Sequence, residues 1–220
     1  MIKRFKKIAH PALKLWHKIY YLSPRKYSYK GVTTIVHKEV FSPYLTISTN
    51  IFVDFIDNLD LKNHKVLELG CGNGLISLFA AKKGAFVTAS DINQTALTYL
   101  NKSAALNQVT INLYYSDLFN DLPKDAYDYI LINPPYYPKN PINIKEQAWF
   151  CGADFEYFKQ LFQQLPTQLT NSNKCYMILS DACQLETINT LAKNENLLMQ
   201  KVFTKKVTGE ENYIFEISKG

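Results

Sequence analysis

The feature that most constrains the fold is a regular alternation of short apolar runs and amphipathic segments, which begins at Lys65. The runs fit strands at residues 65–70, 86–91, 110–116, 127–133 and 175–180, and the segments between them fit helices at about 74–83, 94–106, 154–171 and 184–195. Short apolar strands separated by helices are typical of a parallel sheet that is covered on both faces. The alternation therefore predicts an α/β fold.

Two other patterns complete this prediction. Pro166 interrupts the helix at 154–171, so we expect a kink or an early end there. The chain closes with two β-rich runs, Leu197–Val207 and Asn212–Ser218, whose short Gly209-Glu210-Glu211 link predicts a terminal β-hairpin.

A further helix is expected upstream of residue 65, capped by Ser48 or Thr49. Its apolar face has helical spacing and consists of Phe52, Phe55, Ile56 and Leu59.

The N-terminal segment differs from the rest of the chain in charge. Residues 1–38 contain ten Lys or Arg and no Asp or Glu, whereas residues 39–220 contain fifteen basic and nineteen acidic residues. We predict a basic arm over 1–40, with a short amphipathic helix at about 11–22, followed by a domain over 41–220. The arm suits contact with a polyanion through residues 1–38. A membrane-surface helix and a plain packing element are the alternatives.

Several classes of protein are excluded. The longest apolar stretches are four to six residues, too short for a membrane span, and Lys14, His17 and Lys18 interrupt any signal-peptide core. Four cysteines without a C-x-x-C pair fit neither a disulfide framework nor a zinc ribbon, so we expect a reducing, cytoplasmic compartment and no metal. All four histidines lie at or before His64, which argues against a histidine-based catalytic triad in the later strands.

The first strand runs into a glycine-rich loop that reads Glu68-Leu69-Gly70-Cys71-Gly72-Asn73-Gly74. Such glycines let the backbone turn tightly and approach a ligand at the carboxyl edge of the sheet. A dinucleotide fingerprint starting at Gly70 requires Gly or Ala where this chain has Leu75, and the Lys-Ser/Thr pair of a P-loop is absent. The loop therefore indicates a different small-molecule site.

The next two strands end in carboxylates. Asp91 ends the second strand, where it can accept both hydroxyls of a ribose, and the neighbouring Asn93 suits a helix N-cap. Asp117 ends the third strand, where it can receive an adenine amino group or cap a turn.

The fourth strand runs directly into Asn133-Pro134-Pro135-Tyr136. Together with E-x-G-x-G-x-G and Asp91, this motif resembles the class I S-adenosylmethionine-dependent methyltransferases that modify a planar exocyclic nitrogen, over about residues 40–218. The resemblance implies a Rossmann-like, seven-stranded, mostly parallel sheet in the order 3-2-1-4-5-7-6, with the hairpin at its end.

The resemblance also implies roles for particular residues. Asn133, Pro134, Pro135 and Tyr136 are the expected catalytic residues. The cofactor-binding residues implied are Thr49, Glu68, Gly70, Cys71, Gly72, Gly74, Asp91, Ile92, Asp117, Leu118 and Asn133. An amide or aniline-like nitrogen is a poor nucleophile, so two acceptors, the Asn133 side-chain oxygen and the Pro134 carbonyl, are suited to hold its hydrogens and direct its lone pair. Tyr136 can stack on the planar group.

Within the class, the chain is most similar to the release-factor glutamine N5-methyltransferases and the small-domain methyltransferases. Residues 146–152 and the segment 40–43 resemble stretches of those enzymes. A protein glutamine is therefore the expected acceptor, and an adenine or guanine amino group of RNA or DNA is the alternative. A nicotinamide oxidoreductase and a non-enzymatic nucleic-acid-binding module are rivals from other classes. We expect S-adenosylhomocysteine as by-product and a monomeric protein.

Overall fold

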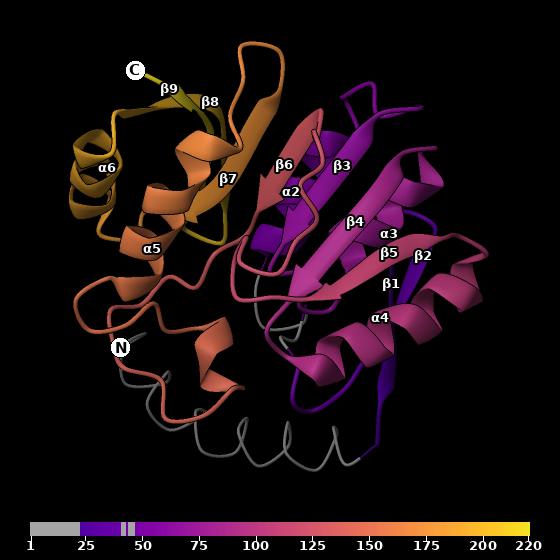
Figure 1. Cartoon of the computed structure of the whole chain (residues 1–220). Coiled ribbons are helices and arrows are strands. Elements are labelled where there is room, and N and C mark those ends of the chain that lie inside the picture. The colour runs from indigo at the N-terminus through magenta and orange to yellow at the C-terminus, as the bar shows by residue number, and fades with distance from the viewer. Residues whose placement is uncertain (1–22, 41–42, 44–46) are drawn as a thin grey trace.

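The computed structural model describes residues 23–40, 43 and 47–220 (Figure 1). The helix expected at about 11–22 lies outside the described residues, as do Phe41 and Ser42 of the segment 40–43. Within the described part, no helix is long and apolar enough to cross a bilayer.

The centre of the described chain is a seven-stranded sheet in the order β5-β4-β3-β6-β7-β9-β8 (Figure 1). Its strands are β3 (Lys65–Leu69), β4 (Phe86–Asp91), β5 (Ile111–Tyr115), β6 (Tyr129–Ile132), β7 (Lys174–Ser180), β8 (Leu197–Val207) and β9 (Glu210–Lys219). The strands β3 to β7 are parallel, and β9 is antiparallel to both β7 and β8. Counted from β3, this is the order 3-2-1-4-5-7-6, so the predicted fold and terminal hairpin are confirmed.

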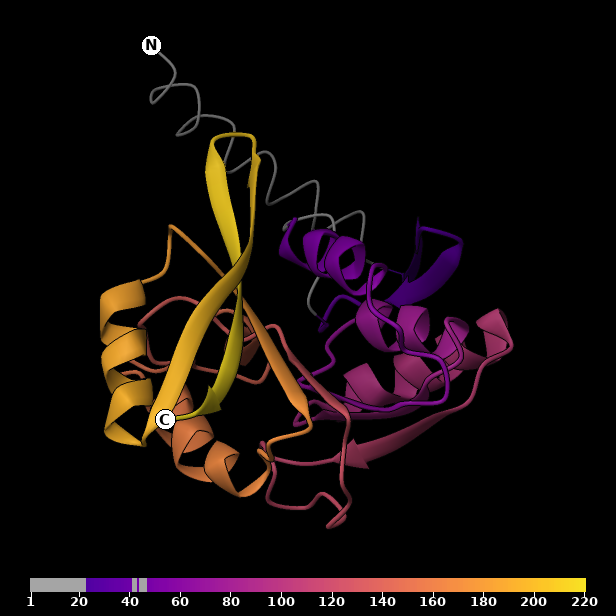
Figure 2. The same ribbon diagram turned by 90° about the horizontal axis from the view of Figure 1, so that it is seen from above.

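Helices cover both faces of the sheet (Figure 2). One face carries α2 (Ser48–Ile56), α3 (Leu75–Lys82) and α4 (Gln94–Asn107), and the other carries α5 (Glu156–Gln164) and α6 (Leu185–Asn194). Successive strand residues point to opposite faces, so Val66 and Leu131 join the first core while Leu67 and Ile130 join the second. This alternation explains why the central strands are apolar throughout.

Local sequence accounts for several helix ends. The helix α5 ends at Gln164 and Pro166 lies in a short 3-10 turn, Leu165–Thr167, as the expected early end requires. Asn93 caps α4, because its Oδ1 accepts from the Thr95 N–H at 3.0 Å.

The cap expected for α2 is wrong. Ile47 occupies the cap position without a side-chain bond, while Ser48 and Thr49 lie inside the helix and are buried. Both residues line the cavity described below, where Thr49 Oγ1 accepts from Asn133 Nδ2 at 3.3 Å.

The described part of the basic arm forms a β-hairpin, β1 (Arg25–Tyr29) and β2 (Val32–Val36), with Gly31 in the turn. Alternate residues of β2, namely Val32, Thr34 and Val36, are fully buried. The hairpin is joined to α4, since the Ile35 N–H donates to Ser103 Oγ at 2.9 Å. The hairpin thus packs on the helices α3 and α4, while the domain boundary at residue 40 stays a prediction.

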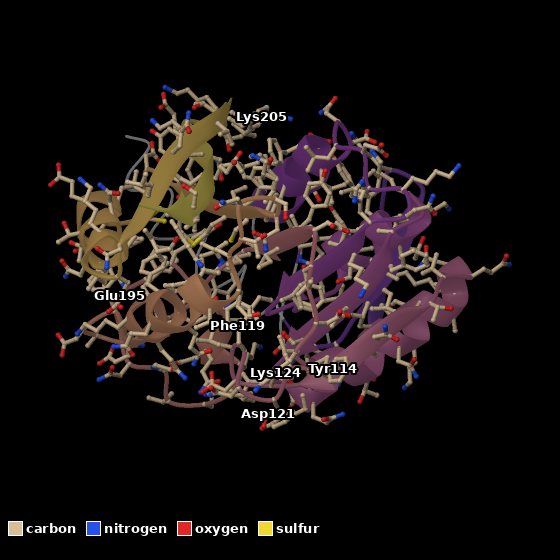
Figure 3. All side chains as sticks on the ribbon, turned by 45° about the horizontal axis from the view of Figure 1, so that its top comes forward. Tyr114, Phe119, Asp121, Lys124, Glu195 and Lys205 are labelled. Atoms are coloured by element: carbon tan, nitrogen blue, oxygen red, sulfur yellow. The ribbon has the colours of Figure 1, made fainter. Side chains whose placement is uncertain are left out.

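Asp54 on α2 joins this hairpin to the C-terminal one. Its carboxylate accepts from the Tyr29 hydroxyl at 2.8 Å and pairs with Lys30 at 2.9 Å and Lys205 at 2.8 Å. Figure 3 shows Lys205 on the β8–β9 hairpin, beside the helices of this face. Burial raises the pKa of Asp54, but Lys205, Lys30 and Tyr29 outweigh burial and lower that pKa to about 2.

Candidate active site

The carboxyl ends of the parallel strands border a cavity of about 610 Å³. Its lining comes from the glycine-rich loop, the ends of β4 and β5, the loop after β6, the segment 147–152 and the β8–β9 turn. Parallel strands place their carboxyl ends at one edge of the sheet, as Figure 1 shows for β3, β4 and β6. This edge brings together all of the predicted site residues except Gly74.

Gly74 has a packing role. Its φ is 73°, a left-handed conformation that favours glycine, and a Cβ there meets Leu100 Cδ1 at 2.3 Å. Gly74 therefore allows α3 to start close to α4. Gly70 has φ of 72°, and a Cβ added there would have no other atom within 4 Å. This position therefore favours glycine because of its backbone conformation alone.

Asp91 holds the glycine-rich loop to the end of β4. Its Oδ2 accepts from the Gly72 N–H at 2.7 Å, and its Oδ1 accepts from the Asn93 N–H at 2.8 Å. Burial raises the pKa of Asp91, and the backbone N–H groups of Asn93 and Gly72 oppose that shift. Each carboxylate oxygen keeps a second lone pair for a ligand in the cavity.

Glu68 lies beneath the same loop and is buried. Its Oε2 accepts from the Ser77 N–H at 2.8 Å and also from the Ser77 hydroxyl, which ties β3 to the first turn of α3. Burial raises the pKa of Glu68 to about 8, against the opposing effect of the Ser77 bonds. Sequence reasoning assigned Glu68 to the cofactor, and the structure adds this structural contact.

The remaining predicted cofactor residues also line the cavity. Cys71 is buried and its N–H donates to the Ser90 carbonyl at 2.8 Å, whereas Ile92 is half-buried at the end of β4. Asp117 is exposed at the rim, where the Gln160 side-chain amide donates to it at 3.3 Å. Leu118 beside it is buried and has φ of 51°.

The loop after β6 forms the other half of the cavity. The Tyr136 hydroxyl donates to Asn133 Oδ1 at 3.0 Å, and Asn133 Nδ2 donates to Thr49 Oγ1 at 3.3 Å. These two bonds fix the orientation of the Asn133 amide. Burial raises the pKa of Tyr136, so its phenol stays protonated and remains a donor.

Backbone pairing holds this loop against the following segment. The N–H groups of Tyr136 and Tyr137 both donate to the Trp149 carbonyl, at 3.1 and 2.9 Å, and the Cys151 N–H donates to the Tyr137 carbonyl at 2.9 Å. Gly152 has φ of 89°, a conformation that favours glycine, and it lies against the Glu156 side chain. The similarity noted for residues 146–152 thus falls on a segment that lines the cavity.

The cavity also contains residues that sequence reasoning did not assign to it. Tyr157 and Gln160 come from α5, and Thr208 and Glu210 come from the β8–β9 turn. The helical pattern around residues 154–171 could have suggested the first two, but no local pattern marks the hairpin turn, which reaches the cavity only through strand pairing.

The sequence profile of the family described as "Methyltransferase small domain" matches residues 31–153, more than half of the chain. The chain belongs to the methyltransferase small domain family. The resemblance stated from the sequence is thereby confirmed at the level of the family, and a nicotinamide oxidoreductase is excluded. The match begins within the β1–β2 hairpin and ends after the loop that follows β6.

Other members resemble this methyltransferase over different lengths. A "Putative protein N5-glutamine methyltransferase" of Methanocaldococcus jannaschii is 40% identical over 170 residues, 74% of this chain and 83% of that protein. A release factor glutamine methyltransferase of Lactococcus lactis is 39% identical over 125 residues, 51% of this chain and 46% of that protein. A solved methyltransferase structure from Pyrococcus furiosus has a TM-score of 0.65 at 19% identity, covering 94% of this chain and 98% of the other, and shares the fold.

Proposed function

We propose that this methyltransferase transfers a methyl group from S-adenosylmethionine to the side-chain amide nitrogen of a protein glutamine. The observation that carries the proposal is the fixed Asn133 amide, held by Thr49 and Tyr136 at the wall of a cavity that also contains the glycine-rich loop. The name of the Methanocaldococcus relative supports glutamine as the acceptor.

The donor fits the half of the cavity around the glycine-rich loop. We assign Asp91 to the ribose hydroxyls, Asp117 to the adenine amino group, and Ile92 and Leu118 to apolar contacts. All four residues line the cavity. Asp91 gives this half negative charge, which suits the cationic sulfonium of the donor. The donor supplies an electrophilic methyl group, and the protein supplies the position of the acceptor.

The acceptor nitrogen needs orientation more than it needs a base. Its lone pair is delocalised into the amide, so its hydrogens must be held while the lone pair turns toward the methyl carbon. Asn133 Oδ1 has a lone pair left beside the Tyr136 bond, and the Pro134 carbonyl is the second acceptor. Neutral hydrogen bonds of this kind contribute about 1 kcal/mol each, whereas alignment of donor and acceptor contributes up to roughly 7–11 kcal/mol.

The test is methylation of a cell lysate with donor labelled in its methyl group. Protease treatment should remove the label while nuclease leaves it, and mass spectrometry should place the methyl group on a glutamine amide. A label that nuclease removes would instead support the adenine or guanine alternative.

A further inference from the structure

The charge of the cavity differs from that of the whole chain. The chain has a net charge of +6, yet the described residues that line the cavity include no Lys, Arg or His. The lining carboxylates are Glu68, Asp91, Asp117, Glu156 and Glu210. A site that receives a phosphate backbone needs cations, because neutralisation of phosphate supplies most of nucleic-acid affinity. The charge of this cavity therefore disfavours a nucleic-acid acceptor and favours a cationic one.

Four of these carboxylates have partners within the protein. Glu68 accepts from Ser77, Asp91 from the backbone of Gly72 and Asn93, Asp117 from Gln160, and Glu156 from the Asp154 N–H. Among the described residues, Glu210 has no hydrogen bond or ion pair of its side chain. Glu210 is half-buried and lines the cavity.

Glu210 lines the same cavity as the loop after β6, which contains Asn133 and Tyr136. It is the first residue of β9 and pairs with Val207 across the hairpin turn. Its charge is close enough to the phenols of Tyr136 and Tyr137 to raise their pKa values, after the larger effect of burial. Glu210 and the loop that is proposed to orient the acceptor nitrogen thus lie near one another in the same cavity.

Three lysines of the same hairpin have partners elsewhere. Lys205 pairs with Asp54 at 2.8 Å, Lys206 pairs with Glu211 at 3.5 Å, and Lys201 lies over the Tyr213 ring at 4.1 Å. Tyr137 and Ile144, which also line the cavity, are 41% and 39% exposed. The rim therefore combines an apolar surface with one carboxylate that lacks a partner, a combination that fits a peptide.

We infer that Glu210 is a specificity-determining residue, which binds a lysine or arginine side chain next to the acceptor glutamine of the protein substrate. This inference rests on the glutamine N-methylation proposed above. A bound cation forms a charge-assisted hydrogen bond with Glu210 and so positions the peptide with its glutamine toward Asn133. Removal of the Glu210 carboxylate should therefore reduce the catalytic efficiency for cationic peptides and leave donor binding unchanged.

The experiment uses the full chain, S-adenosylmethionine and three peptides of identical sequence with one glutamine, flanked by lysine, serine or glutamate. We expect kcat/KM to favour the lysine peptide over the serine peptide by about tenfold, and the glutamate peptide to be poorest. Glu210→Gln should remove most of the lysine advantage, and Glu210→Lys should reverse the order. Calorimetry should give the same donor affinity for all variants.

Glu211→Gln is the matched control, because Glu211 neighbours Glu210 but bonds to Tyr213 and Lys206. It should keep the order of the parent. Equal rates for all three peptides, or an unchanged order in Glu210→Lys, would overturn the role of Glu210 while glutamine methylation stands. Methylation of an RNA oligonucleotide and of none of the peptides would overturn both proposals.

Discussion

The hydroxyl of Thr34 donates a hydrogen bond to the carbonyl of Asn73, so the N-terminal hairpin supports the glycine-rich loop directly. Thr34 is fully buried in β2, and Asn73 in turn accepts from the Leu75 N–H through its side chain at 3.0 Å. The hairpin lies outside the strand–helix alternation, yet it contacts the loop that is proposed to bind the donor.

Thr34→Val tests this support. The substitution keeps the shape of the side chain and leaves the buried Asn73 carbonyl without the Thr34 donor, a loss of about 1–3 kcal/mol. We expect a melting temperature lower by about 2–8 °C and weaker binding of S-adenosylmethionine. Thr33→Val is the control, since Thr33 Oγ1 bonds only the exposed Ser28 hydroxyl at 2.8 Å and should change neither quantity. Equal effects of the two variants would contradict the prediction.

Asp91→Ala should weaken donor binding strongly, because Asp91 shapes the loop and is proposed to accept the ribose hydroxyls. Each charge-assisted bond contributes about 1.5–3 kcal/mol, so the affinity should fall at least tenfold. The melting temperature should fall as well, because the Gly72 and Asn93 N–H groups lose their acceptor. Calorimetry with donor and by-product measures the first effect. Asp117→Ala, at the exposed rim, should lose less affinity, and unchanged binding in Asp91→Ala would reject the cofactor assignment.

Asn133→Ala should lower kcat by about two powers of ten while donor affinity stays within a few-fold. The lost acceptor matters mainly when the amide nitrogen changes geometry, which is the behaviour of a group that acts in the transition state. Thr49→Val removes one of the two bonds that orient the Asn133 amide, so it should lower kcat by a smaller factor, about tenfold. Single-turnover rates and calorimetry separate the two quantities. If Asn133→Ala turned over at the parent rate, the loop after β6 would have a structural role and no catalytic one.

Glu68 should make the stability depend on pH. Its pKa is raised to about 8 in the folded protein from an ordinary value of 4.5, so folding favours the protonated form. This contribution is fully present below about pH 4.5 and is lost as the pH rises through about 8. Glu68→Gln stays neutral and should flatten the fall in melting temperature between pH 5 and 8.5. Asp121→Asn, an exposed residue labelled in Figure 3, should leave the slope unchanged.

Deletion of residues 1–22 tests the polyanion prediction for the basic arm. This truncation keeps the β1–β2 hairpin, so it should leave the melting temperature and donor binding close to those of the parent. If the arm contacts a polyanion, association with RNA should weaken and lose much of its dependence on salt. Filter binding over a salt series measures this. Deletion of residues 1–36 removes Thr34 as well and should lower the melting temperature by several degrees. Parent-like RNA binding by the shorter deletion would argue against the prediction.

The sequence alone determined the order of strands and helices, and it identified most of the residues at the carboxyl edge of the sheet. The apolar runs and helices are local patterns, and parallel strands separated by helices necessarily place their carboxyl ends together. For this reason Gly70, Asp91, Asp117 and Asn133 could be assigned to one cavity before the structure was known, and all four line it. The early end of α5 at Pro166 and the cap by Asn93 are also local effects, set by a missing N–H and by one short side chain.

Only the tertiary structure decided which distant residues complete the site. Thr34 reaches the glycine-rich loop across 39 residues, Thr49 reaches Asn133 across 84, and Lys205 reaches Asp54 across 151. Ser48 and Thr49 suited a helix cap by their residue type but are buried at the cavity, and Glu210 enters it through the pairing of β9 with β7 and β8. Contacts of this kind depend on how helices and strands pack and pair. The periodicity of the sequence indicates which face of an element is apolar, but it does not indicate which distant residue a single side chain will contact.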